Sequence, residues 1–199
     1  MRQLTPRYKT HGTRQVWLTF DDGPHGTNTP RVLDVLAGHG ITAVFFLVGR
    51  NAAAYPQIVK RMAREGHRIG NHTYNHPDLR KLGRAKVREE ILKTEKLIAP
   101  FIKGRKLFRP PYGAHNATVD DVLADLGYRL VLWNVDPLDW NKAYQPTKWT
   151  DLAMSQIRAR SNAVVLAHDI HRTTAAHLDS LIRRIKRLPG TRFQPAASL

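Results

Sequence analysis

The sequence Leu18-Thr19-Phe20-Asp21-Asp22-Gly23-Pro24 begins as a strand and ends with two adjacent carboxylates at a Gly-Pro turn. Bulky residues of high strand propensity extend this strand back to Val16. Because Gly-Pro stops the strand, both Asp residues are predicted at the C-terminal end of a buried strand, where parallel α/β folds place their reactive groups. Neighbouring carboxylates repel unless a cation lies beside them, so one Asp holding a metal and the other free as a base is a stable arrangement. A plain turn, with one Asp as a cap or Asx-turn, stays open on this stretch alone.

Length and composition predict a single well-packed domain. The chain has 199 residues, of which 42% are hydrophobic, enough for one core. It contains no Cys, which excludes disulfides and thiolate metal sites. No run of 18 apolar residues is present, so we expect no membrane span. Residues 1–15 are polar and basic, which indicates no signal peptide; we expect a tail at residues 1–14 and one domain at residues 15–199.

The net charge is strongly positive. The chain carries 32 Lys and Arg against 16 Asp and Glu, a net charge of +16. Such a balance favours polyanionic partners, namely nucleic acid, an anionic membrane surface or an acidic cell-wall polymer. The basic residues are spread over the predicted helices and form no dense block interleaved with aromatic residues, as a single-strand binder would have. We therefore favour a generally basic, solvated surface over a specific nucleic-acid site.

Strand and helix patterns alternate along the chain. Short apolar runs predict strands, and apolar residues spaced three or four apart between caps and Gly stops predict helices. This order indicates βαβ units and a parallel sheet, but the pattern alone does not separate an open doubly wound sheet from a closed barrel. We predict strands at 16–20, 43–48, 67–71, 106–108, 129–135 and 163–167, and helices at 29–38, 55–65, 82–99, 117–126, 148–158 and 173–187.

Reactive residues gather directly after the predicted strands. Chance would scatter them over both ends of the sheet, so their common position indicates one site at the C-terminal edge. The clusters are Asp21-Asp22, His72-Thr73-Tyr74-Asn75-His76-Pro77, Arg109-Pro110-Pro111-Tyr112-Gly113, Asp136-Pro137-Leu138-Asp139-Trp140 and His168-Asp169.

The spacing of His72 and His76 indicates metal binding. On a helical turn, residues four apart present both imidazoles on one face, a geometry used for divalent metals. One H-x-x-x-H arises readily by chance in a chain with 10 His. With a carboxylate from another strand end the set becomes His, His and carboxylate, which suits zinc or a similar ion with positions open for water and substrate. Water activated at such an ion still requires a base to take its proton and an acid for the leaving group.

These clusters resemble a known family. The five stretches Thr19–Pro24, His72–Pro77, Arg109–Gly113, Asp136–Trp140 and Leu166-Ala167-His168 are similar, in order, to the five motifs of the NodB-homology polysaccharide deacetylases, carbohydrate esterase family 4. The resemblance covers residues 16–187, nearly the whole chain. It implies an α/β fold, a distorted (β/α)7-8 barrel of the NodB type, and metal-dependent removal of acetyl groups from N-acetylated sugars or of O-acetyl groups from some polymers.

The resemblance also implies a role for each motif residue. Asp22, His72 and His76 would hold one divalent ion, with Zn²⁺ first and Co²⁺, Mn²⁺ or Ni²⁺ as alternatives. Asp21, held by Arg109, would be the general base for the attacking water, and His168, oriented by Asp139, would be the general acid on the departing amine. The Tyr112 main-chain N–H would stabilise the oxyanion, and Trp140 and Leu166 would flank the acetyl methyl group. Asp136 has two interpretations, a turn cap before Pro137 or a share in the role of Asp139.

The sequence indicates the substrate less directly than it indicates the reaction. The resemblance implies N-acetylglucosamine in peptidoglycan or chitin-type oligosaccharides, and the +16 charge favours an anionic wall polymer. Alternatives are an O-acetyl xylan esterase, a glycan-binding protein without turnover, and a basic nucleic-acid or membrane-surface protein. We expect a monomer with no specific nucleic-acid partner. The family implies an extracellular, periplasmic or cell-envelope location, although the missing signal peptide leaves the cytoplasm open.

Overall fold

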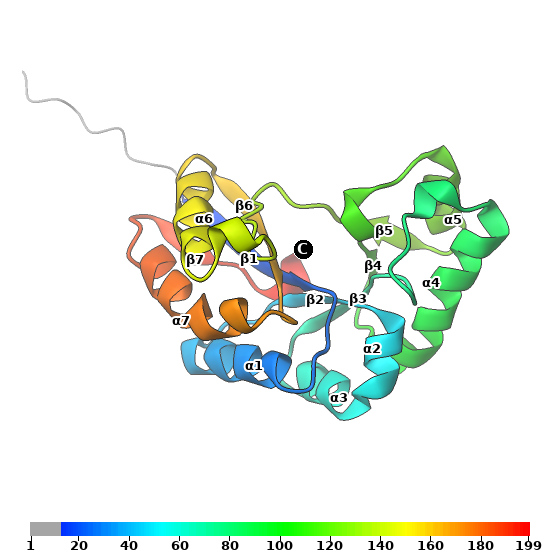
Figure 1. The fold of residues 1–199 in the computed structure, drawn as a ribbon, viewed down its shortest axis with the longest axis horizontal. Helices are drawn as coiled ribbons and strands as arrows, with labels where there is room; N and C mark the ends of the chain where they lie inside the picture. Colours follow the sequence, from blue (N-terminus) through cyan, green and yellow to red (C-terminus); the bar gives the residue numbers. More distant parts are fainter. Residues whose placement is uncertain (1–12) are drawn as a thin grey trace, which may run out of the picture.

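Strands and helices alternate in the computed structural model, which describes residues 13–199 (Figure 1). Of the tail expected at residues 1–14, residues 1–12 lie outside the part of the chain that the structure describes. The strands are β1 (Arg14–Asp21), β2 (Val44–Leu47), β3 (Arg68–Asn71), β4 (Lys106–Phe108), β5 (Tyr128–Leu130), β6 (Asn162–His168) and β7 (Thr191–Phe193). The α-helices are α1 (Asn28–His39), α2 (Gly49–Ala54), α3 (Pro56–Arg64), α4 (Arg84–Ile98), α5 (Ala117–Asp125), α6 (Lys148–Arg158) and α7 (Arg172–Lys186).

All strand pairs are parallel, as the βαβ pattern predicts. Within residues 13–199 the strand order is β5-β4-β3-β2-β1-β6, and β7 pairs with the start of β1. β1 and β6 pair along their length, which places Asp21 opposite His168. Between β5 and β6, the structure has only the isolated bridge of Val135 to Val165. The sheet therefore curves into a distorted, incompletely closed barrel, and the segment after β5 crosses between its two edges (Figure 1).

Alternation along β1 and β2 decides which side chains face the barrel interior. In β2, Phe45 and Leu47 belong to the large core beneath the helices, whereas Val44 and Phe46 belong to a smaller core with Leu107, Val131 and Ala196. Successive side chains of a strand point to opposite faces, and a strand buried on both faces is a continuous apolar run. By the same alternation Leu18 and Phe20 pack under the helices, and Thr19 and Asp21 face the other way.

Helices cover the outside of the barrel. α1 and α7 lie next to each other and, with α3 and α6, bury the main core against β1, β2 and β6. A second core lies between α4, α5, β4 and β5 and includes Ile91, Phe108 and Val122. Burying each of these large side chains contributes roughly 1.5–3 kcal/mol to folding. None of the helices described in residues 13–199 is both long and apolar enough to cross a bilayer.

Three local expectations differ from the structure. The strand predicted at 129–135 ends at Leu130, because the next main-chain oxygens, of Val131 and Leu132, accept hydrogen bonds from the Arg109 guanidinium instead of a neighbouring strand. The helix predicted at 55–65 is preceded by α2, a short helix that the sequence pattern did not indicate. The last segment forms the short strand β7, for which the sequence pattern predicted no strand.

Candidate active site

Asp21 and Arg109 form a buried ion pair inside the barrel. Arg109 Nη1 donates to Asp21 Oδ1 at 2.8 Å, and the two side chains are 0% and 4% exposed. The same guanidinium donates to Thr19 Oγ1 at 2.8 Å and to Val131 O at 3.0 Å, and it stacks on the Phe46 ring at 4.2 Å. These contacts fix the fork of Arg109, so one Asp21 oxygen is bound and the carboxylate is held at the strand end.

Asp22, His72 and His76 bring three donor atoms together. His76 Nε2 lies 3.2 Å and His72 Nε2 lies 3.4 Å from Asp22 Oδ1, and all three donors lie within 4.8 Å of one another. Donors about 2.0–2.1 Å from a tetrahedral ion are about 3.3 Å apart. Asp22 Oδ1 is also buried without a hydrogen-bond partner among the described residues. The set therefore suits one divalent ion.

The protonation states of these groups also fit a cation. His72 Nδ1 lies 2.6 Å from Arg109 O. Because a carbonyl oxygen only accepts, Nδ1 carries the proton and Nε2 keeps its lone pair for a ligand bond. Burial raises the pKa of Asp22, but the adjacent His72 and His76 imidazoles outweigh burial and hold that pKa well below its usual range. Asp22 is therefore an anion.

The loop that carries His72 and His76 is irregular, which corrects the helical interpretation of their spacing. Residues 72–76 form no helix, and Thr73 and His76 have φ values of 67° and 64°. Glu90 of α4 holds this loop, since its carboxylate accepts from the main-chain N–H of Tyr74 at 3.0 Å and from Asn75 N and Nδ2 at 2.8 and 2.7 Å. Both imidazoles thus reach Asp22 through a fixed loop rather than through helical periodicity.

His168 and Asp139 form a second buried pair. His168 Nδ1 donates to Asp139 Oδ1 at 2.8 Å, and Asp139 Oδ2 accepts from His168 N at 2.7 Å and from Thr174 Oγ1 at 2.6 Å. Burial lowers the pKa of His168, but its hydrogen bond to Asp139 and the charges of Asp139 and Asp22 raise that pKa to about 9. The imidazole is therefore protonated at neutral pH, with its Nε2 proton not used by Asp139.

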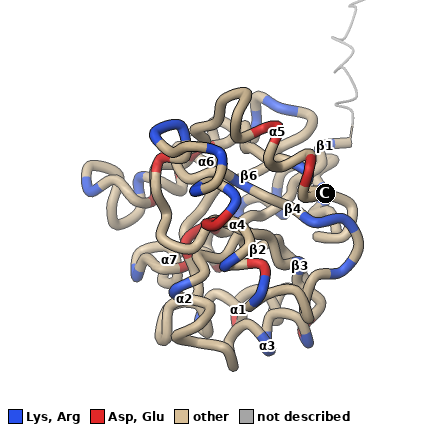
Figure 2. Tube along the Cα trace, turned by 90° about the vertical axis from the view of Figure 1, so that its right-hand side faces the viewer, with Lys and Arg blue, Asp and Glu red and all other residues tan. Residues whose placement is uncertain are grey.

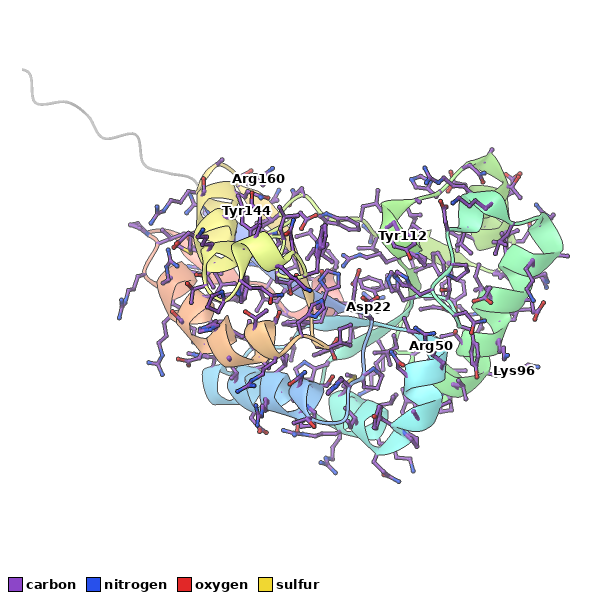
Figure 3. All side chains as sticks on the ribbon, in the orientation of Figure 1. Asp22, Arg50, Lys96, Tyr112, Tyr144 and Arg160 are labelled. Atoms are coloured by element: carbon purple, nitrogen blue, oxygen red, sulfur yellow. The ribbon has the colours of Figure 1, made fainter. Side chains whose placement is uncertain are left out.

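A pocket of about 390 Å³ joins these groups. Figure 3 shows Asp22 near the centre of the molecule and Tyr112 on the segment that follows β4. Tyr112 is 68% exposed with φ 61°, and its turn is closed by the N–H groups of Gly113 and Ala114, so the Tyr112 N–H is not used in that closure. The residues that line the pocket are Asp21, Asp22, His72, His76, Tyr112, Trp133, Asp136, Trp140, Leu166, His168, Ile170 and His171.

Asp136 lines the pocket but differs from Asp139. Its Oδ1 accepts from Leu138 N at 3.0 Å, which is an Asx-turn, and only Asp139 bonds to His168. Of the two interpretations of Asp136, the structure supports the turn cap.

Sequence reasoning missed several supporting residues. Thr174, Thr19 and Glu90 each bond to a motif residue or its loop, and Glu90 was detectable as an acid on the apolar face of α4 beside Val87 and Ile91. Asp169 is fully buried under Gly23, where a Cβ would meet its carboxyl group at 2.1 Å. Its carboxyl group accepts from Thr29 Oγ1, and burial raises the pKa of Asp169 to about 7. The sequence placed Asp169 in a reactive cluster with His168 but assigned it no role.

The fold and the site define a class of protein: a distorted parallel α/β barrel whose strand ends hold donors for one divalent ion beside a buried carboxylate and a protonated imidazole. A family model described as polysaccharide deacetylase matches residues 8–131. The chain belongs to this family, the NodB-like carbohydrate esterase family 4, which confirms the prediction from its motifs.

Individual relatives agree with this assignment. The chain is 39% identical over 182 residues to a peptidoglycan-N-acetylglucosamine deacetylase of Listeria monocytogenes, covering 91% of this chain but only 37% of that relative's length. It is 37% identical to a chitooligosaccharide deacetylase of Sinorhizobium fredii, covering 94% of this chain and 92% of the relative. A family 4 carbohydrate esterase from Streptomyces lividans, solved in complex with acetate, has a TM-score of 0.79 at 36% identity, covering 89% and 90% of the two chains.

Proposed function

We propose that this protein is a divalent-metal-dependent N-deacetylase that acts on N-acetylglucosamine residues of peptidoglycan or chitin-type oligosaccharides. The observation that carries the proposal is the meeting of three groups in one pocket: the donors Asp22, His72 and His76, the pair Asp21–Arg109, and the pair His168–Asp139. The names of the two relatives support the same reaction on these two glycans. The ion is Zn²⁺ in this proposal, since two imidazoles and one carboxylate form a set that zinc accepts with an open position.

The residues divide the reaction between them. When bound, the ion lowers the pKa of water and polarises the acetyl carbonyl. Asp21 takes the proton of the attacking water, and Arg109 keeps that carboxylate oriented. Water oxygen forms a bond to the acetyl carbon while the Tyr112 N–H stabilises the oxyanion. His168 gives its Nε2 proton to the sugar nitrogen as the C–N bond breaks, which releases acetate and a free amine.

The apolar residues that line the pocket provide a binding site for the acetyl methyl group. Leu166 is buried at 3% exposure, and Trp140 is 49% exposed at the same pocket. In our proposal Leu166 and Trp140 flank the acetyl methyl group. Membership of this family implies an extracellular, periplasmic or cell-envelope location, and we expect the protein to act there. We also expect it to act as a monomer.

The test is an acetate-release panel on N-acetylchitooligosaccharides, peptidoglycan and acetyl xylan, with chelator or with added Zn²⁺, Co²⁺, Mn²⁺ or Ni²⁺. We expect release from the N-acetylated glycans that depends on added metal. Release from acetyl xylan alone would replace the proposal with an O-acetyl esterase. Glycan binding without acetate under every metal condition would refute the proposed catalysis.

A further inference from the structure

A second pocket lies at the opposite end of the strands from the candidate active site. It has a volume of about 410 Å³ and contains four basic residues, Arg68, Lys103, Arg105 and Arg129, which we name the basal arginine pocket. Arg68 is the first residue of β3, whereas the metal-donor loop begins after the last residue of that strand. The strand has four residues, about 13 Å at about 3.3 Å per residue. The two pockets are therefore separate sites.

Three chain segments bring these cations together. Arg68 comes from β3, Arg129 from β5, and Lys103 and Arg105 from the loop before β4. The C-terminal segment completes the wall, and Figure 2 shows the end of the chain beside Lys and Arg residues near β3 and β4. The side chains thus converge on one hollow and are not merely neighbours on one helix face.

Oxygens of Arg105, Ala197 and Leu199 orient two of the guanidinium groups. Arg68 Nη2 donates to Arg105 O at 2.6 Å and Nη1 donates to Ala197 O at 3.4 Å, while Arg129 Nη1 donates to Leu199 O at 2.7 Å. Each guanidinium has five N–H groups, so most of these donors stay available. Among the side-chain carboxylates of residues 13–199, none forms an ion pair with these four residues, whereas Arg61 and Arg84 on other faces are paired.

The electrostatics of the pocket favour an anion. Burial, followed by the nearby positive charges of Arg129 and Arg105, lowers the pKa of the Arg68 guanidinium. Like charges this close repel one another, and a multiply charged anion between them removes the repulsion. Carboxylate has two oxygens and matches one guanidinium fork, whereas tetrahedral phosphate offers oxygens in several directions to several forks.

We propose that the basal arginine pocket binds a phosphate group, either as free phosphate or within a phosphodiester polymer. The competing explanation is structural, because the N-terminal end of barrel strands usually serves stability and Arg68 and Arg129 also fasten the C-terminal segment. Lys103 and Arg105 separate the two explanations. Their side chains make no hydrogen bond or ion pair among the described residues, so removing their charges leaves those fastening contacts in place.

The experiment compares wild type with Lys103→Gln/Arg105→Gln. Intact metal-loaded protein is titrated with inorganic phosphate at constant ionic strength, and binding is followed by the amide NMR shifts of Gly66 and Gly104, which line the pocket. We expect saturable shifts in wild type and at least fivefold weaker binding in the variant. A matched control, Arg31→Gln/Arg88→Gln, removes the same charge from two exposed positions on α1 and α4 and is expected to change the affinity less than twofold.

Two further titrations identify the chemical class of the ligand. A titration with a glycerol-phosphate oligomer tests whether the pocket binds a phosphodiester polymer. At equal phosphate concentration, the tighter binder of the oligomer and free phosphate is the ligand that the pocket prefers. Acetate tests carboxylate, and binding as tight as that of phosphate would overturn the proposal. Equal losses in the test and control variants would overturn it too, since they would indicate general surface charge. Acetate release from a neutral chitooligosaccharide should be unchanged in Lys103→Gln/Arg105→Gln, so this result is independent of the proposed deacetylation.

Discussion

Two adjacent carboxylates at the end of β1 have different surroundings. Asp22 is in the left-handed region with φ 75° and faces the two imidazoles, whereas Asp21 faces Arg109. Asp22→Asn should therefore abolish binding of the divalent ion. Asp21→Asn should keep the ion and lower kcat by about 10²–10⁴, the usual contribution of a general base.

Metal content by mass spectrometry and acetate release by coupled assay check both variants. Retention of a full equivalent of metal in Asp22→Asn would show that the donor set is misassigned. Loss of metal in Asp21→Asn would mean that Asp21 is itself a ligand.

The His168–Asp139 pair allows a prediction about proton affinity. In metal-free protein we expect His168 to titrate with a pKa of about 9, because Asp139 and the other carboxylates stabilise the imidazolium. Asp139→Asn should lower this pKa towards 6.5, and Asp136→Asn is the matched control because Asp136 does not bond to the ring. Two-dimensional NMR of the imidazole measures both values. An unchanged pKa in Asp139→Asn would contradict the proposed pairing.

The same pair has a consequence for stability against pH. The folded pKa of His168 lies above its unfolded value of 6.5, so the folded state binds the proton more tightly. This contribution is complete below about pH 6.5 and is lost as the pH rises through about 9. The difference in unfolding free energy between wild type and Asp139→Asn, measured by urea denaturation of metal-free protein, should shrink over this interval. A constant difference would indicate that Asp139 acts only through packing.

Among the elements, α4 supports the metal-donor loop through one buried acid. Glu90 is 4% exposed and accepts from three N–H groups of Tyr74 and Asn75. Glu90→Gln replaces an acceptor by a donor that faces these N–H groups, so we expect a loss of about 1–3 kcal/mol in stability and weaker binding of the divalent ion.

Thermal unfolding with and without metal, together with a metal-competition titration, tests this role of α4. Glu89→Gln is the control, since Glu89 lies on the exposed side of the same helix. Equal metal affinity in the two variants would show that the loop keeps its shape without Glu90.

Sequence periodicity predicted most elements but gave the wrong reason for one site contact. Buried strands and amphipathic helices follow from local apolar patterns, and Asp21 and His168 follow from the rule that strand ends carry function. The spacing of His72 and His76 suggested a helix, yet Asn71 and Glu90 bind the main-chain N–H groups of the intervening residues and replace helical hydrogen bonds. Such contacts join residues far apart in the sequence, so no local pattern indicates them.

At the scale of the whole molecule, the same limit applies to barrel closure. The order of strands and helices did not separate an open sheet from a barrel, and only the resemblance to the family implied a barrel, because the deciding feature is the path of residues 131–135 between β5 and β6. That path depends on Arg109, which takes the oxygens of Val131 and Leu132, and on Asn134, which donates to Asn162 O and accepts from Val164 N. Hydrogen bonds between residues this far apart in the sequence form only once the core is assembled. The order of helices and strands, in contrast, follows from local sequence patterns.

The charge of the molecule predicts how its rate depends on salt. The net charge is +16, and Figure 2 shows Lys and Arg spread over many elements of the described chain. The residues that line the active-site pocket include neither Lys nor Arg. A spread charge raises the local concentration of an anionic chain without contributing to chemistry, and this attraction is screened as the Debye length falls from about 10 Å at 0.1 M salt to about 3 Å at 1 M. We therefore expect KM for soluble peptidoglycan fragments bearing free carboxylates to rise severalfold over this range, with kcat constant.

A neutral N-acetylchitooligosaccharide provides the internal control for that dependence. It carries no charge, so its KM should change little over the same range, and initial-rate acetate assays measure both substrates under identical metal loading. A parallel rise of KM for both substrates would assign the salt effect to the metal site or to the fold. A response confined to the charged substrate supports the surface charge as a means of concentrating an anionic glycan, because only the long-range attraction differs between the two substrates.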